Sequence, residues 1–113
     1  DLASLLRDSY TFLPEELIEQ LMENYMNYIY DQRRTKIVKN LFKDNFHLSG
    51  FQRNLKAWGR FHFIDKVKNN PSFLEHIPNT IKQIKRFTGK HLLTERCDRL
   101  LRAISPEYSS ISV

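Results

Sequence analysis

The chain has 113 residues, of which 41% are hydrophobic and 12% aromatic, and its formal net charge at pH 7 is +5. This length and apolar content favour one domain with its own core and exclude a disordered chain, which could not bury enough apolar surface to offset its conformational entropy. No apolar run approaches the roughly 18–20 residues that span a bilayer, so the sequence predicts no membrane partner. The single cysteine, Cys97, cannot form an internal disulfide and favours a cytoplasmic or nuclear location.

Acidic and basic residues are distributed unevenly along the chain. Residues 1–31 contain seven acidic residues and one basic residue, Arg7, whereas the rest of the chain contains 17 basic and 6 acidic residues. Separated patches of opposite sign permit head-to-tail docking between copies or onto a related domain, and they select the partner. Charged faces are therefore the first candidates for a binding site.

The spacing of apolar residues predicts an all-α domain, a compact bundle of about six to seven short helices. Only three glycines and no alternation of β-branched residues leave strands without support. Residues 2–6 carry a short apolar stripe, and Pro14 fits the first position of a second helix. In that helix apolar residues recur at i, i+3, i+4 and i+7 as far as Ile29, so we expect it to end near Tyr30.

The middle of the chain is predicted to form three separate helices. Asp31 can cap the first of them, whose buried face consists of Ile37, Val38, Leu41 and Phe42. A capping box of Ser49 and Gln52 opens the second helix, and Gly59 ends it. The third helix runs as far as the Asn-Asn-Pro sequence at residues 69–71.

The second of these helices is too short to be stable alone, so its apolar side requires tertiary contact. We expect it to pack against the helix that precedes it, with Gly59 at a helix end. The residues in contact would be Phe51, Leu55 and Trp58 on one side and Ile37 and Leu41 on the other.

Two further helices are predicted after residue 71. A capping box of Ser72 and Glu75 opens a short segment that Pro78 breaks or restarts. An amphipathic helix then continues to Gly89 with the apolar residues Ile81, Ile84 and Phe87. The last helix carries an apolar stripe of Leu92, Leu93, Cys97, Leu100, Leu101 and Ile104.

These elements suggest a division of the chain into parts. We expect a helical bundle over residues 1–70. Residues 71–104 would add helices that pack on this bundle or begin a second module. Residues 105–113 are predicted to be a flexible tail.

No residue pattern matches a catalytic or metal-binding constellation. The four histidines, at positions 47, 62, 76 and 91, stand 14 or 15 residues apart and lack the spacing of metal sites. Gly50 and Gly59 are isolated, and each is explained by a helix boundary instead of a phosphate-binding loop. We therefore predict a binding protein that is not an enzyme and uses no cofactor, and we interpret Cys97 as a small core residue.

Two charged clusters form the leading candidate site. The acidic cluster has no basic i+4 partner on its own helix and consists of Glu15, Glu16, Glu19 and Glu23. The basic cluster follows it and consists of Arg33, Arg34, Lys36 and Lys39, joined in sequence by Arg53, Lys56 and Arg60. Complementary faces of this kind predict a module that recruits a partner protein or assembles with copies of itself in a signalling complex.

A basic helical module for RNA or DNA is the alternative of a different class. The residues that would contact phosphates are Lys82, Lys85, Arg86, Lys90, Arg96, Arg99 and Arg102. The last three recur at i+3 steps and share a side of their helix, which suits contact with a phosphate backbone.

Part of the pattern resembles a known family. The segments concerned are Ile37-Val38-x-x-Leu41, Phe51-x-x-x-Leu55-x-x-x-Gly59 and Phe63-Ile64-x-x-Val67. They resemble the second half of caspase recruitment domains of the death fold, and residues 11–20 resemble a helix junction in the recruitment domains of RNA-sensing helicases of innate immunity. This resemblance covers about residues 2–70 and implies a protein-interaction module. Residues 80–87 resemble a helix of the transcription-elongation-factor N-terminal bundle family, which implies a third possibility, binding of peptides from nuclear partners.

Overall fold

The computed structural model describes residues 2–34 and 37–113, which form six α-helices, one 3-10 helix and no strand. The elements are α1 (Leu2–Leu6), α2 (Glu15–Arg33), α3 (Lys39–Lys68), η1 (Pro71–His76), α4 (Ile77–Lys85), α5 (Leu92–Ile104) and α6 (Pro106–Ser110). The predicted all-α bundle is confirmed. Within these residues, no helix combines the length and the apolar character that crossing a membrane requires.

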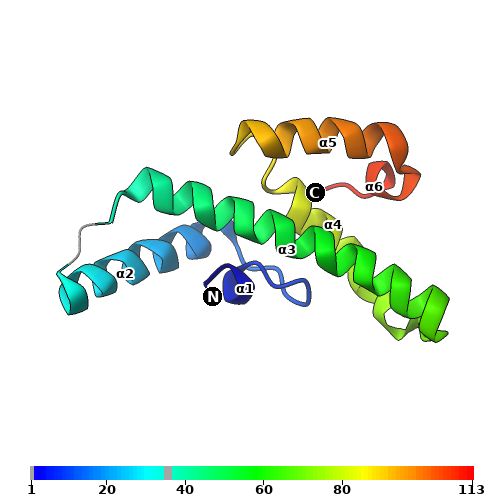
Figure 1. Ribbon diagram of the computed structural model, residues 1–113, viewed down its shortest axis with the longest axis horizontal. Helices are drawn as coiled ribbons and strands as arrows, with labels where there is room; N and C mark the ends of the chain where they lie inside the picture. The colour runs from blue at the N-terminus through cyan, green and yellow to red at the C-terminus, as the bar shows by residue number, and fades with distance from the viewer. Residues whose placement is uncertain (1, 35–36) are drawn as a thin grey trace.

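The longest helix, α3, is continuous where the sequence predicted three helices. Its 30 residues rise about 45 Å at about 1.5 Å per residue. It therefore sets the long axis of a molecule that measures 49 × 28 × 21 Å (Figure 1). The predicted boundaries at Ser49 and Gly59 were wrong because either residue costs a helix interior only about 1 kcal/mol or less, which packing outweighs. The predicted stop is confirmed, since α3 ends at Lys68 and Asn69 takes a left-handed conformation.

The connection between α2 and α3 also differs from the prediction. Asp31 lies inside α2, and the left-handed Arg34 follows the end of that helix, so Asp31 caps nothing. Val38 precedes α3 in an extended conformation and is exposed. Leu41 is 59% exposed and lies on the same straight helix as Phe51, so the predicted packing between them was wrong.

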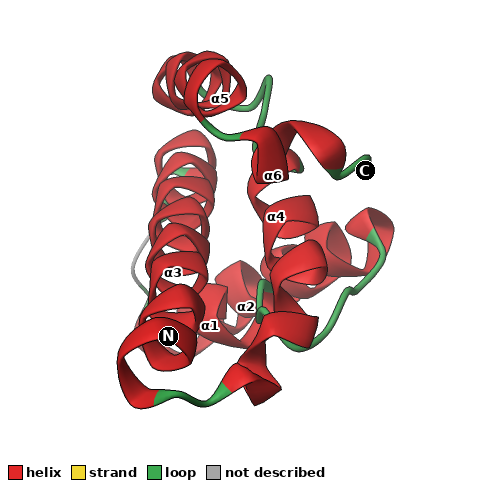
Figure 2. Cartoon of the chain, turned by 90° about the vertical axis from the view of Figure 1, so that its right-hand side faces the viewer, coloured by secondary structure: helices red, strands yellow, loops and turns green. Residues whose placement is uncertain are grey.

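The main hydrophobic cluster lies between α3 and α4, which run side by side (Figure 2). Its buried residues are Phe51, Phe61, Ile77, Ile81, Ile84, Phe87 and Tyr108. Leu55 and Trp58 pack against this cluster, so they face α4 and the C-terminal segment. The predicted apolar face of residues 81–87 is confirmed, because Ile81, Ile84 and Phe87 have no exposed surface.

A second cluster joins α1, α2 and the first half of α3, with the buried residues Ala3, Leu6, Ile18, Met22 and Phe46. At the other end of α3, Asn70 begins the short helix η1, because its side-chain oxygen accepts from the Ser72 amide at 3.1 Å. Asn70 therefore provides the cap that the sequence assigned to Ser72.

The C-terminal residues predicted as a tail contain a helix and a core residue. Pro106 starts α6, and the Ser105 hydroxyl caps it by accepting from the Tyr108 amide at 3.1 Å. Tyr108 has no exposed surface, its ring stacks on Trp58 at 5.9 Å, and its hydroxyl donates to Asp98 at 2.5 Å. The prediction missed this segment because a single aromatic residue in a short helix produces no periodic pattern.

The carboxylate of Glu107 in α6 binds two side chains of α3. Glu107 Oε1 accepts from Trp58 Nε1 at 2.6 Å and lies 2.8 Å from His62 Nε2. Partial burial opposes ionisation of Glu107, but hydrogen bonds from His62 and Trp58 outweigh it and hold the pKa of this carboxyl below its usual range.

Gly50 is required by a close approach inside the fold, and its predicted role at a helix boundary was wrong. A Cβ atom at this position would lie 2.7 Å from Cζ of Phe87 and 3.2 Å from Cγ of Arg7. Gly59, also inside α3, has no heavy atom within 4 Å of its Cβ position. A methyl group at position 50 would therefore clash with neighbouring side chains, whereas one at position 59 would have open space.

Substituting these glycines is expected to change stability in opposite directions. Gly50→Ala should lower the free energy of unfolding by about 1–3 kcal/mol, because Phe87 is buried and must move. Gly59→Ala should raise it by about 0.5–1 kcal/mol through better helix propensity. Urea denaturation of both variants measures the two changes, and a stabilised Gly50→Ala protein would contradict the close approach.

Candidate functional site

Three of the four residues in the predicted acidic cluster form ion pairs within the chain. Glu15, the first residue of α2, binds Arg7 in a bidentate ion pair at 2.5 and 3.0 Å. It also lies 3.0 Å from Nε of Arg86 and 3.6 Å from Nζ of Lys90. Burial favours the neutral carboxyl, but the hydrogen bond and charge of Arg7, with the charges of Arg86 and Lys90, outweigh it and hold the pKa of Glu15 below its usual range.

Two more members of the acidic cluster face α3, because α2 and the first half of α3 form a hairpin (Figure 1). Glu19 pairs with Lys43 at 3.3 Å, and Glu23 pairs with Lys39 at 3.2 Å and with Lys43 at 3.6 Å. Glu16 remains exposed. The structure therefore gives three of the acidic residues partners within the chain, which the sequence did not predict.

The structure also divides the predicted basic cluster. Arg33 and Arg34 belong to the end of α2, not to the next helix as predicted, and Lys39 is engaged by Glu23. Lys36 lies outside the described residues. Arg53 and Lys56 lie on the middle of α3, away from the hairpin tip.

The basic residues of the nucleic-acid alternative are mostly engaged within the fold. Lys85 is buried and donates to the carbonyl oxygen of Ile111, and burial lowers its pKa. Arg102 binds Asp98 at 2.8 Å. Arg86 and Lys90 share Glu15, and the Arg86 guanidinium lies 3.7 Å from the ring centre of Phe12. Lys82 is half-buried, and the remaining two, Arg96 and Arg99, are exposed on α5.

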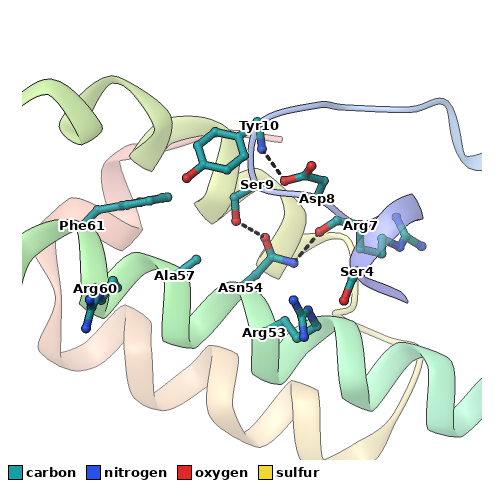
Figure 3. Close-up of a pocket in the computed structure, with 10 residues that line it drawn as sticks. All are labelled: Ser4, Arg7, Asp8, Ser9, Tyr10, Arg53, Asn54, Ala57, Arg60 and Phe61. Atoms are coloured by element: carbon teal, nitrogen blue, oxygen red, sulfur yellow. Dashed lines mark hydrogen bonds between the residues drawn. The ribbon is translucent and has the colours of Figure 1, made fainter. Parts of the chain in front are cut away.

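A basic face remains on the middle of α3. Arg53, Lys56 and Arg60 follow one another at i, i+3 and i+7, and with the small residue Ala57 they line a hollow of about 270 Å³. A second hollow, of about 240 Å³, shares Arg53, Ala57 and Arg60 and reaches the segment before α2 (Figure 3). It is lined by Ser4, Arg7, Asp8, Ser9, Tyr10, Arg53, Asn54, Ala57, Arg60 and Phe61. We call the two hollows together the α3 groove.

Asn54 forms three hydrogen bonds, and two of them, with Arg7 and Ser9, hold the wall of the α3 groove (Figure 3). Its amide nitrogen donates to the carbonyl oxygens of Arg7 and Gly50 at 2.9 and 2.8 Å. Its side-chain oxygen accepts from the Ser9 hydroxyl at 3.0 Å. Asn54 is buried, so each of these bonds satisfies a polar group that water could not reach.

Side chains of α4 hold the same segment from the other side. Asn79 Nδ2 donates to the carbonyl oxygens of Ser9 and Thr11 at 2.6 and 2.9 Å, and Gln83 Nε2 donates to that of Thr11 at 2.8 Å. Tyr10 meets His76 edge to face at 4.6 Å. The wall of the α3 groove is therefore fixed by both α3 and α4.

The α3 groove is basic, and an apolar strip of Phe63 and Val67 lies beyond it on the same helix. Among the residues that line the two hollows, Asp8 is the one acid, and its carboxylate accepts from the Tyr10 amide at 3.0 Å. Beyond Arg60, the exposed residues Phe63 and Val67 continue along α3, and the Arg60 guanidinium lies 5.7 Å from the Phe63 ring centre. This arrangement suits an acidic ligand that also presents apolar surface.

Sequence reasoning found part of this site. Arg53, Lys56 and Arg60 were predicted as an extension of the basic cluster around Arg33. Ala57 and the apolar strip of Phe63 and Val67 were not predicted. A continuous helix through Gly59 would have placed all of these on one face.

The described residues contain no group of three or more histidine, cysteine, aspartate or glutamate side chains that could hold a metal ion. No protein-family model, curated protein or solved structure matches the chain in a comparison with known proteins.

Proposed function

We propose that the chain is a protein–protein interaction module that binds an acidic segment of a partner protein in the α3 groove. The observation that carries the proposal is the placement of Arg53, Lys56 and Arg60 around the space that Ala57 leaves. Arginine side chains can hold carboxylates through two parallel hydrogen bonds. A partner with carboxylates at helical or extended spacing would meet three cations and a single lining acid, Asp8.

The apolar strip beyond the α3 groove favours a protein partner over a nucleic acid. Phe63 and Val67 are 43% and 59% exposed and lie on the same helix as the basic residues. Arginine and aromatic residues are enriched where protein partners bury surface, whereas phosphate binding depends chiefly on charge. The alternative set of basic residues is also largely engaged, since Lys85, Arg86, Lys90 and Arg102 have partners within the chain.

The proposed function is still that of a protein-interaction module, but the binding surface is the α3 groove instead of the acidic side of α2. Docking through the acidic side of α2 would require Glu15, Glu19 and Glu23 to leave Arg7, Lys43 and Lys39. We therefore assign the carboxylates to a different protein instead of a second copy. The resemblance to caspase recruitment domains stays a prediction and implies the same class of function.

Charge reversal in the α3 groove is expected to weaken binding of an acidic peptide. The probe is a fluorescein-labelled peptide rich in glutamate with one leucine, titrated with the whole chain and followed by fluorescence anisotropy. Arg60→Glu should reduce the affinity by about tenfold or more, equal to about 1.4 kcal/mol, because it removes one cation and adds a repelling charge. The affinity should also fall with added salt.

The matched control is Arg34→Glu, which makes the same charge change at the far end of α2. It should bind the peptide like the original protein. Equal binding by Arg60→Glu would overturn the proposal. A single-stranded RNA oligonucleotide that binds where the peptide does not would overturn it in favour of the nucleic-acid alternative.

A further inference from the structure

The last long helix, α5, leaves its apolar side in water. Leu93, Cys97, Leu100 and Ile104 recur at intervals of four, three and four residues, the a and d spacing of a coiled coil. Cys97 is partly buried against the core, but Leu93, Leu100 and Ile104 are 53%, 59% and 65% exposed. We call these four residues the α5 seam.

The opposite side of α5 packs against the rest of the protein through buried polar residues and the partly buried Leu101. The buried residues of this helix are Thr94 and Asp98. Thr94 donates to the carbonyl oxygen of Phe87 at 2.8 Å, and Asp98 accepts from Tyr108. The predicted last helix is confirmed, but these hydrogen bonds turn most of its apolar stripe outward into water. In Figure 2, α5 lies above α3 and α4. Leu93, Leu100 and Ile104 of the α5 seam remain exposed.

The charges beside the α5 seam specify what can cover it. Arg96 takes the heptad position next to the seam, and Arg99 follows one turn later. Both are exposed, and neither forms an ion pair with another described residue. A helix that docks on the α5 seam with carboxylates on its flank would satisfy both arginines.

A second copy of α5 does not supply those carboxylates. In an antiparallel pair, the position opposite Arg96 is taken by the copy's own Arg96 or Ala103, and in a parallel pair by Thr94 or Leu101. Each copy also brings a net charge of +5. Charge complementarity therefore excludes the second copy as the preferred occupant and requires a different chain.

We infer that α5 is a docking surface for an amphipathic helix of a partner protein, with leucines that meet the α5 seam and glutamates that meet Arg96 and Arg99. This surface is separate from the α3 groove, so a partner could engage one without the other. Recognition would combine burial of the exposed leucines with two charge-assisted contacts at the edge.

Peptide probes that differ only in flanking charge test the inference. One fluorescein-labelled helical peptide carries leucine at its a and d positions and glutamate at e and g, and the other carries lysine at e and g. The whole chain should bind the glutamate peptide at least about tenfold more tightly than the lysine peptide. Leu100→Glu and Arg96→Glu should each weaken binding of the glutamate peptide by about tenfold or more.

The control variant is Leu41→Glu, because Leu41 and Leu100 are both 59% exposed and lie on different helices. Circular dichroism and melting temperature should be unchanged in Leu100→Glu and Leu41→Glu, and only the former should lose peptide binding. Equal binding by Leu100→Glu, or equal affinity for the two peptides, would overturn the inference. A dimer in sedimentation that Leu100→Glu dissociates would overturn it by making a second copy the occupant.

The same titrations separate this inference from the proposed function. Arg60→Glu should leave binding of the leucine–glutamate helix unchanged, whereas Leu100→Glu should leave binding of the glutamate-rich peptide with a single leucine unchanged. Loss of the helical peptide in Arg60→Glu alone would place it in the α3 groove and overturn the assignment to α5.

Discussion

Tyr108→Ala is expected to lower the free energy of unfolding by about 3–5 kcal/mol, the cost of emptying a large buried aromatic site. The side chain has no exposed surface and belongs to the main hydrophobic cluster with Phe51 and Phe61. Its loss would leave a cavity beside Trp58 and remove a donor from the buried Asp98 carboxylate. Urea denaturation followed by far-ultraviolet circular dichroism measures the change.

Two variants separate the contributions of Tyr108. Tyr108→Phe keeps the ring and loses the hydrogen bond to Asp98, so it should cost about 1.5–3 kcal/mol, the range for a bond to a charged acceptor. Val113→Ala, at the exposed end of the same segment, should change nothing measurable. Unchanged stability of Tyr108→Ala would mean that residues 105–113 behave as the tail that the sequence suggested.

Acidification from pH 6.5 to pH 4 is expected to remove about 3 kcal/mol of stability through His47. This residue is buried between the rings of Phe46 and Phe87. Burial, aided by the charges of Lys90 and Arg7, lowers the pKa of His47 to about 4. His47 therefore becomes protonated near pH 6.5 in the unfolded chain but only near pH 4 in the folded protein. The stabilisation present above pH 6.5 is lost as the pH falls towards 4.

The interval from pH 6.5 to 5.5 separates the titration of His47 from that of the carboxylates. Glu15, Asp98 and Glu107 have lowered pKa values, so their stabilising contribution is complete above the unfolded carboxyl pKa and is lost only at lower pH. His47→Gln cannot titrate and should therefore flatten the dependence of unfolding free energy on pH in this interval. An unchanged slope in that variant would contradict the assignment.

Helices with a strong local pattern could be predicted from the sequence. The apolar spacing of residues 17–29 and of residues 81–87 identified α2 and α4, because each buries one continuous side against a neighbour. The stop at residues 69–71 was equally local, since a left-handed Asn69 ends α3 before Pro71. In these cases the signal and the structure depend on the same few residues.

Features decided between distant segments could not be predicted. Whether Ser49 and Gly59 interrupt α3 depends on the packing of α4 and α6 along it, and the sequence around them shows only weak helix breakers. The partners of Glu15 are just as distant in sequence, since Arg86 and Lys90 follow α4. The basic residues of the candidate site could be predicted because they are near one another in sequence on α3. The wall of the α3 groove could not, because it comes from the distant residues Arg7 and Ser9, which Asn54 binds.

The segment of residues 8–11 has a place in the order of folding. Its carbonyl groups accept from Asn79 and Gln83 of α4, 68 to 75 residues away in sequence, and its Ser9 hydroxyl donates to Asn54 of α3. The side chains of Asn54, Asn79 and Gln83 converge only after α3 and α4 have come together. We expect contacts so distant along the chain to form late, because closing the intervening loop costs entropy. Residues 8–11 are therefore expected to form their hydrogen bonds to α3 and α4 late in folding, which would complete the wall of the α3 groove last.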